Sequence, residues 1–214
     1  MTGILFDLDG TLLDTLEDLT DATNYALKEF GFPERSREQV RRAVGNGAAN
    51  QIRRCTPEGT PEETVQEILT VYKAYYTDHC QIKTKPYEGV CRALEELKKK
   101  YPVGIVSNKP DSAVKVLCQT YFPGIFALGE TADCPRKPAA DMVHKGMKAI
   151  GADGCVYVGD SEVDVLTAKN AGCPCLCVLW GFRDRQDFEA AGGMHFCADT
   201  GTLTEKIEEL IHGK

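Results

Sequence analysis

The sequence predicts an α/β protein that consists of a parallel β-sheet core and an inserted all-helical segment. Two observations support this fold class. Over the second part of the chain, short apolar runs alternate with stretches of helical periodicity, which is typical of a parallel sheet with helices on both faces. Between residues 14 and 82, in contrast, the periodic stretches are helical and no strand signal appears. The 214 residues suffice for one core domain and a small insert.

The first part of the chain predicts one strand followed by four helices. Ile4–Phe6 is a short apolar run that ends in polar residues, as buried parallel strands do. Apolar residues then recur at helical spacing from 16 to 30, where Gly31 ends the pattern. Three further helices are expected near 37–44, from 48 onward, and over 61–79, and the break between the first two is Gly45-Asn46-Gly47.

From residue 83 onward, helices and strands alternate. We expect strands at 103–106, 125–128, 155–158 and 175–179, because these runs are short, apolar and bounded by turn residues. The helices expected between and after them are 90–100, 112–120, 139–150, 163–171, 187–191 and 202–211. Lys137-Pro138 is expected to open the helix over 139–150, since helices tolerate proline at their start.

Polar clusters follow three of these strands. Asp7 and Asp9 come after the first strand, Ser107-Asn108-Lys109 after the strand at 103–106, and Asp160 and Asp164 after the strand at 155–158. In open α/β sheets, ligands bind at the carboxyl ends of the strands, so these side chains are candidates for one site. Two acids there suit a hard cation or a nucleophile with an acid/base partner, although Asp7 and Asp9 alone would also fit a solvated strand end.

Together with Lys137, these clusters resemble the four signature motifs of the haloacid dehalogenase-like hydrolase superfamily, and most closely its phosphoglycolate phosphatase-like branch. The most specific parts of the resemblance are residues 6–15, 159–172 and 179–183. The resemblance covers nearly the whole chain. It implies a Rossmann-like core formed by residues 1–13 and 83–214, and a helical cap domain formed by residues 14–82.

The resemblance also implies catalytic roles. Asp7 would be the nucleophile and form an aspartyl-phosphate, and Asp9 would be the general acid and base, with a pKa above its usual range. Lys137 would add positive charge beside Asp7. Mg²⁺ would be bound by the carboxylates of Asp7 and Asp160 and by the backbone carbonyl of Asp9, because Mg²⁺ keeps several waters and needs few protein ligands.

Other residues would bind the phosphoryl group or support the site. Ser107 and the backbone N–H of Asn108 would hold the phosphoryl oxygens, with Gly10 and Thr11 allowing close approach and a hydroxyl donor. Asp164 would either accept a hydrogen bond from a metal-bound water or orient Lys137. Lys109 is interpreted as a surface residue, and Glu162 is placed outside the site.

The cap would select the substrate. Gly45, Asn46 and Gly47 resemble the cap loop that the phosphatase branch places over its active site. The expected activity is therefore Mg²⁺-dependent hydrolysis of a small phosphomonoester such as phosphoglycolate. The alternatives are a pyrophosphatase, a nucleoside 5′-monophosphate phosphatase, a sugar-phosphate phosphatase or phosphomutase, and a regulator that binds phosphate without catalysis.

Composition limits the partners. The net charge of −7 argues against nucleic acid and anionic membranes as partners, so a small phosphorylated metabolite is expected, bound by a monomer or a homodimer. No signal peptide is recognised at the start, and the expected location is the cytoplasm. The ten cysteines contain no Cys-x-x-Cys pair and are interpreted as small apolar residues in a reducing compartment, with a redox or metal-storage role as the alternative.

Overall fold

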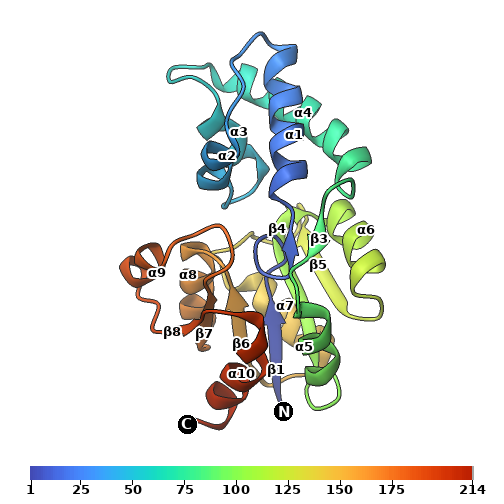
Figure 1. The fold of residues 1–214 in the computed structure, drawn as a ribbon, viewed down its shortest axis with the longest axis vertical. Helices are drawn as coiled ribbons and strands as arrows, with labels where there is room; N and C mark the ends of the chain where they lie inside the picture. Colours follow the sequence, from blue (N-terminus) through green and yellow to red (C-terminus); the bar gives the residue numbers. More distant parts are fainter. Residues whose placement is uncertain (214) are drawn as a thin grey trace. The chain divides into compact units, whose positions relative to one another are not determined.

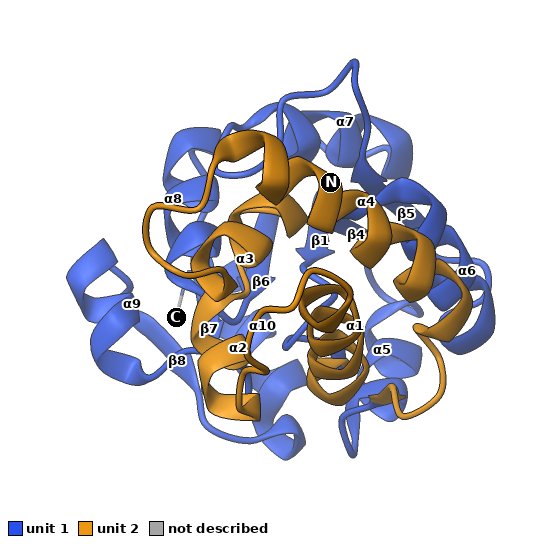
Figure 2. Cartoon of the chain, turned by 90° about the horizontal axis from the view of Figure 1, so that it is seen from above, with its two compact units in different colours: residues 1–14, 86–214 blue, residues 15–85 orange. Residues whose placement is uncertain are grey.

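The computed structural model describes residues 1–213. The chain forms two compact units, which Figure 2 shows in two colours. Unit 1 contains residues 1–14 and the chain from Pro86 onward, and unit 2 contains residues 15–85. The sequence-based boundaries, 13/14 and 82/83, lie close to these. The two segments that connect the units pair as the short strands β2 (Leu13–Asp14) and β3 (Lys85–Pro86).

Unit 1 contains a six-stranded sheet with the strand order β5-β4-β1-β6-β7-β8, and its strand pairs are parallel. Strand β1 lies in the centre, where Leu5 is paired with Gly104 on one side and Tyr157 on the other. This sheet confirms the predicted α/β fold class. The strands are β1 (Thr2–Phe6), β4 (Val103–Pro110), β5 (Phe126–Glu130), β6 (Gly154–Gly159), β7 (Cys175–Val178) and β8 (His195–Cys197).

Helices cover both faces of this sheet (Figures 1 and 2). One face carries α7 (Asp141–Ile150), α8 (Glu162–Ala171) and α9 (Arg185–Ala191), and the other carries α5 (Val90–Leu97), α6 (Asp111–Tyr121) and α10 (Leu203–His212), which follows the 3₁₀ turn η1 (Thr200–Thr202). Such a sheet needs helices on both faces because its central strands are apolar on both sides.

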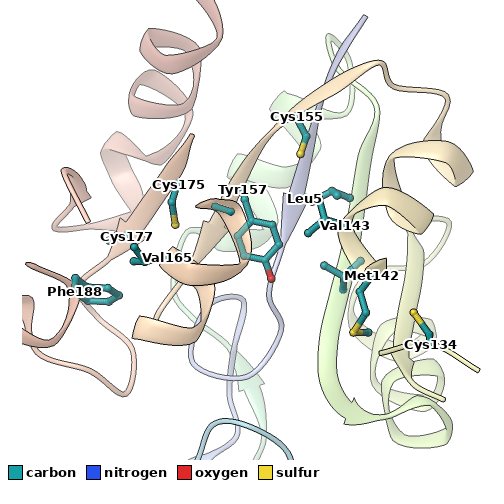
Figure 3. Packing of buried hydrophobic residues seen from close by; sticks show 12 residues of the cluster. Leu5, Cys134, Met142, Val143, Cys155, Tyr157, Val165, Cys175, Cys177 and Phe188 are labelled. Carbon is teal, nitrogen blue, oxygen red and sulfur yellow. The ribbon is translucent and has the colours of Figure 1, made fainter. Parts of the chain in front are cut away.

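The core between the sheet and helices α7 and α8 positions the polar ends of the strands. Leu5, Met142 and Val143 are fully buried around the Tyr157 ring, as Figure 3 shows. Burial of each such aliphatic side chain stabilises the fold by roughly 1.5–3 kcal/mol. Central strands fixed in this way hold the residues that follow them in a defined position.

Three details differ from the sequence-based prediction. Strand β8 was not predicted, because His195–Cys197 is too short to show an alternating pattern. Strand β4 continues through Ser107-Asn108-Lys109 to Pro110 instead of ending at residue 106. Helix α7 begins at Asp141, so Lys137-Pro138 does not open it. The backbone N–H and carbonyl of Lys137 bond to the Asn108 side chain, which holds this segment outside the helix.

Unit 2 is all-helical, with α1 (Leu16–Glu29), α2 (Arg37–Ala43), α3 (Ala48–Cys55) and α4 (Glu62–His79). Helices α1 and α4 make the largest contact within the unit. The buried Asp18 carboxylate, in the first turn of α1, accepts hydrogen bonds from the backbone N–H groups of Lys83 and Thr84 at 2.9–3.0 Å. The entering and leaving segments of unit 2 are therefore tied together.

Two further properties concern the length of the helices and the state of the cysteines. Over residues 1–213, none of the helices combines the length and the apolar character that crossing a membrane requires. The ten cysteines are free thiols, and eight of them are buried, as expected of small apolar core residues.

Candidate active site

The predicted site residues of unit 1 meet at the carboxyl edge of the sheet. Asp7 directly follows β1, and its N–H donates to the Val158 carbonyl of the neighbouring strand β6 at 2.8 Å. Ser107 lies in the last part of β4, and Asp160 directly follows β6. Since β4, β1 and β6 are adjacent and parallel, their carboxyl ends bring these side chains to one edge.

Lys137 is buried between two carboxylates. Its Nζ lies 2.9 Å from Oδ1 of Asp7 and 2.8 Å from Oδ1 of Asp164, and it donates a hydrogen bond of 3.0 Å to the hydroxyl of Tyr157. Burial alone would lower the pKa of Lys137, but the charges of Asp164 and Asp7 outweigh it and hold that pKa well above its ordinary value. Lys137 is therefore a fixed positive charge beside Asp7.

Asp164 has its hydrogen-bonding capacity largely filled by protein groups. Oδ1 accepts from Lys137 and from the Tyr157 hydroxyl at 3.2 Å, and Oδ2 accepts from the backbone N–H and the hydroxyl of Ser161 at 3.0 and 2.7 Å. The bond from the Ser161 N–H caps the start of α8. Of the two roles that the sequence left open, this geometry favours the orientation of Lys137.

Asp160 is held by the loops around it. Its Oδ2 accepts the Phe182 N–H at 2.8 Å, and its Oδ1 accepts the Thr11 hydroxyl at 3.3 Å. A Cβ atom on Gly10, whose φ is 81°, would lie 2.0 Å from Asp160 Oδ2, and one on Gly181 would lie 2.3 Å from Asp160 Cβ. The Thr11 hydroxyl, predicted as a phosphate donor, donates to the Asp160 carboxylate in this structure, and its role toward phosphate stays a prediction.

The carboxylates of Asp7, Asp160 and Asp164 form a group whose oxygens lie within 4.8 Å of one another. Burial raises the pKa of Asp7 to about 7 and raises that of Asp160 well above its ordinary range, and the charge of the neighbouring Asp164 adds to both shifts. Oδ1 of Asp7 is buried and ion-paired with Lys137, and no other donor among residues 1–213 reaches it. Crowded, buried carboxylates of this kind fit a hard divalent cation.

Asp9 and Lys109 form a second buried pair. Nζ of Lys109 donates to both carboxylate oxygens of Asp9, at 2.8 and 3.0 Å, and the Lys109 side chain is 2% exposed. The interpretation of Lys109 as a surface residue is therefore wrong. It failed because β4 continues beyond Val106 and carries Lys109 into the protein.

Ser107 and Asn108 contact their neighbours in different ways. The Asn108 side chain bonds to both backbone groups of Lys137, donating from Nδ2 to the carbonyl at 2.9 Å and accepting the N–H at 2.8 Å. The Ser107 hydroxyl accepts the Lys109 N–H at 3.3 Å. The Asn108 side chain thus fixes the segment from which Lys137 reaches Asp7, a contribution for which the sequence carries no signal.

Two residues near the site were missed or left without a role. Arg183 is buried and donates from Nε to Glu162 at 2.8 Å, and its charge lowers the pKa of Asp160 against the effect of burial. Tyr157 was assigned only to the strand core. The sequence carries no signal for either contribution, because both residues act through side chains brought together by folding.

Gly45, Asn46 and Gly47 lie in unit 2, between α2 and α3. Asn46 has a φ of 58°, and its carbonyl accepts a hydrogen bond of 2.8 Å from Nδ2 of Asn50. Gly47, with a φ of 84°, caps the start of α3. The expected part of this loop in substrate selection stays a prediction.

Comparisons with known proteins agree on the family. The family model described as haloacid dehalogenase-like hydrolase matches residues 4–178. The chain is 33% identical over 218 residues to the phosphoglycolate phosphatase of Mesorhizobium japonicum, covering 95% of each chain. It is 34% identical to phosphoglycolate phosphatase 1 of Pseudomonas aeruginosa, over 84% of this chain and 70% of the relative. A Lactobacillus delbrueckii crystal structure, provisionally named phosphoglycolate phosphatase, matches with a TM-score of 0.91 and 36% identity, covering 96% and 98% of the two chains.

Proposed function

Because the chain belongs to the haloacid dehalogenase-like hydrolases, we propose that it is a Mg²⁺-dependent phosphatase of a small phosphomonoester, with phosphoglycolate as the leading substrate. It is a phosphoric monoester hydrolase, as its curated relatives indicate. The names of those relatives support phosphoglycolate, and the net charge of −7 argues against a polyanionic partner.

The observation that carries the proposal is the buried Asp7 carboxylate, whose Oδ1 lies 2.9 Å from Nζ of Lys137 and within 4.8 Å of the carboxylate oxygens of Asp160 and Asp164. A carboxylate nucleophile that attacks an anionic phosphoryl group needs such a positive charge beside it. Asp7 and Asp160 would hold Mg²⁺, together with the Asp9 carbonyl that the family resemblance implies, and the ion would supply charge that keeps Asp7 ionised and offsets the phosphoryl oxygens.

The reaction then has two half-reactions. Asp7 attacks phosphorus, the bond between phosphorus and the ester oxygen breaks, and Asp9 gives its proton to the leaving oxygen, which departs as an alcohol. Asp9 next takes a proton from a water molecule, whose oxygen attacks the phosphorus of the aspartyl-phosphate. Inorganic phosphate leaves, and Asp7 is regenerated. Lys137, fixed by Asp164 and Tyr157, holds a positive charge beside the attacking oxygen throughout.

Residues 15–85 would act as the cap that selects the substrate. The loop Gly45-Asn46-Gly47 is the part of unit 2 for which the sequence predicts this role. If the loop selects, Gly47→Val changes the relative kcat/KM of several small substrates while Mg²⁺ affinity is kept, since the proposed metal ligands belong to unit 1. An equal loss on all substrates, with weaker Mg²⁺ binding, contradicts this role.

The proposed activity is tested by measuring phosphate release from a panel of substrates with Mg²⁺. The panel contains phosphoglycolate, inorganic pyrophosphate, a nucleoside 5′-monophosphate and a sugar phosphate. We expect the highest kcat/KM for phosphoglycolate and loss of turnover in Asp7→Asn and in excess chelator. Asp133→Asn is the matched control, since its side chain is 81% exposed. Turnover that survives in Asp7→Asn, or no release from any substrate, would overturn the proposal.

A further inference from the structure

Lys109 is a buried cation to which the proposed mechanism gives no role. Both of its contacts to Asp9 are short, and the Asp9 side chain is 15% exposed against 2% for Lys109. The ammonium is therefore the deeper member of the pair, and the carboxylate lies nearer to the solvent.

The proposed chemistry requires this pair to separate. To give a proton to the ester oxygen, the Asp9 carboxylate has to turn toward the substrate and can no longer accept from Lys109 through both oxygens. A buried ammonium that loses its carboxylate is strongly unfavourable, because burial removes the water that would otherwise solvate it. Another anion must then take the place of Asp9, and the substrate is the anion that arrives at this moment.

Other cations nearby are already held by protein groups. Lys137 is fixed between Asp7, Asp164 and the Tyr157 hydroxyl, and Arg183 donates to Glu162. Lys109 contacts Asp9, the residue that would protonate the ester oxygen. Lys137 contacts Asp7, the nucleophile that would attack the phosphorus from the opposite side. Lys109 is therefore placed on the side of the leaving group.

We infer that Lys109 binds a second anionic group of the substrate, carried by the leaving group next to its ester oxygen, and so selects substrates of this kind. The inference rests on the proposed phosphatase function. A carboxylate one carbon from the ester oxygen and a second phosphoryl group share this chemistry. In the resting protein the Asp9 carboxylate occupies the position, and an anionic substrate takes it over, which releases the Asp9 side chain to turn toward the ester oxygen.

The test compares kcat/KM for three substrates of similar size: phosphoglycolate, inorganic pyrophosphate, and ethyl phosphate, which lacks the second anion. In the parent protein at least one anionic substrate should exceed ethyl phosphate by roughly 10- to 100-fold, the range expected of one charge-assisted hydrogen bond. The anionic substrate with the higher kcat/KM shows whether Lys109 binds a carboxylate or a phosphoryl group. In Lys109→Met this ratio should fall to about one, and Lys109→Arg should keep part of it.

Lys145→Met is the matched control, since Lys145 pairs with Asp133 on the surface, and its ratios should equal those of the parent. Asp7-dependent turnover of the three substrates at equal rates in the parent overturns the inference and the choice of phosphoglycolate as leading substrate, and leaves the proposed phosphatase activity intact. An equal loss of kcat/KM on all three substrates in Lys109→Met also overturns the inference and leaves the proposed phosphatase activity intact. Absence of turnover on any substrate instead refutes the proposed function. If Lys109→Met does not fold, the same comparison is made in Lys109→Arg, where ratios equal to those of the parent overturn the inference.

Discussion

Replacing Tyr157 with Phe removes a single hydroxyl from the base of the site and leaves the packing of the ring unchanged. This hydroxyl accepts a hydrogen bond from Lys137 at 3.0 Å and donates one to Asp164 at 3.2 Å. Tyr157 has no exposed surface, so water has no access to replace the lost partner. The substitution therefore tests whether the hydroxyl helps to hold the lysine.

The magnitude follows from what the substitution leaves behind. One N–H of the buried Lys137 ammonium loses its acceptor, and a buried donor without a partner costs about 1–3 kcal/mol, or more when it is charged. Asp164 keeps its bonds from Lys137 and Ser161, so its own loss is small. We expect the free energy of unfolding to fall by about 2–3 kcal/mol, and Tm to fall by about 4–12 °C.

Urea unfolding and thermal melting, both followed by circular dichroism at pH 7, measure this loss. Tyr101→Phe is the matched control: the Tyr101 hydroxyl is on the surface, 3.4 Å from Nε2 of His212, and its removal should change stability by less than about 0.5 kcal/mol. If Tyr157→Phe proves as stable as Tyr101→Phe, the hydroxyl does not hold Lys137 and the reasoning is refuted.

Three other predictions concern the site. As pH rises toward 7, the affinity for Mg²⁺ should increase about tenfold per pH unit, and above pH 7 it should level off. The reason is that burial raises the Asp7 pKa to about 7, so the ion must displace a proton from Asp7 at lower pH. Calorimetric titrations that show no pH dependence of Mg²⁺ affinity would contradict this. Without metal, the free energy of unfolding should fall as pH rises from about 4 to 7. Over this range the raised Asp7 pKa keeps the proton bound in the folded state, whereas the unfolded state has lost it. Urea unfolding at several pH values measures this fall. Asp9→Ala should slow an alkyl phosphate more than an aryl phosphate, whose leaving group needs less protonation; equal losses of kcat would argue against acid catalysis by Asp9.

Much of the core was predictable because its signals are local. The apolar run Ile4–Phe6 and the run at 155–158 are short, and the polar residues after each mark the carboxyl end of a parallel strand. Once both runs are assigned to one sheet, Asp7 and Asp160 must meet, since parallel neighbours end at the same edge. The meeting of these two acids therefore needed no knowledge of side-chain packing.

The contacts of Lys109 and Tyr157 were not predictable in the same way. Lys109 follows two polar residues, a pattern that usually marks the end of a strand, whereas β4 continues through all three with every side chain buried. Tyr157 lies in an apolar run, where an aromatic residue is expected to pack. That its hydroxyl meets Lys137 depends on two segments 20 residues apart, and periodicity carries no information on such a pairing.

The two glycines around Asp160 limit how this site can diverge. Any side chain at Gly10 or Gly181 would overlap the Asp160 side chain, so substitutions at these positions move the carboxylate itself. Selection for a new substrate therefore cannot act by lining this part of the site with different side chains. Diversification is directed to positions that tolerate replacement, which allows the leaving-group side to change while the phosphoryl-transfer chemistry is inherited unaltered.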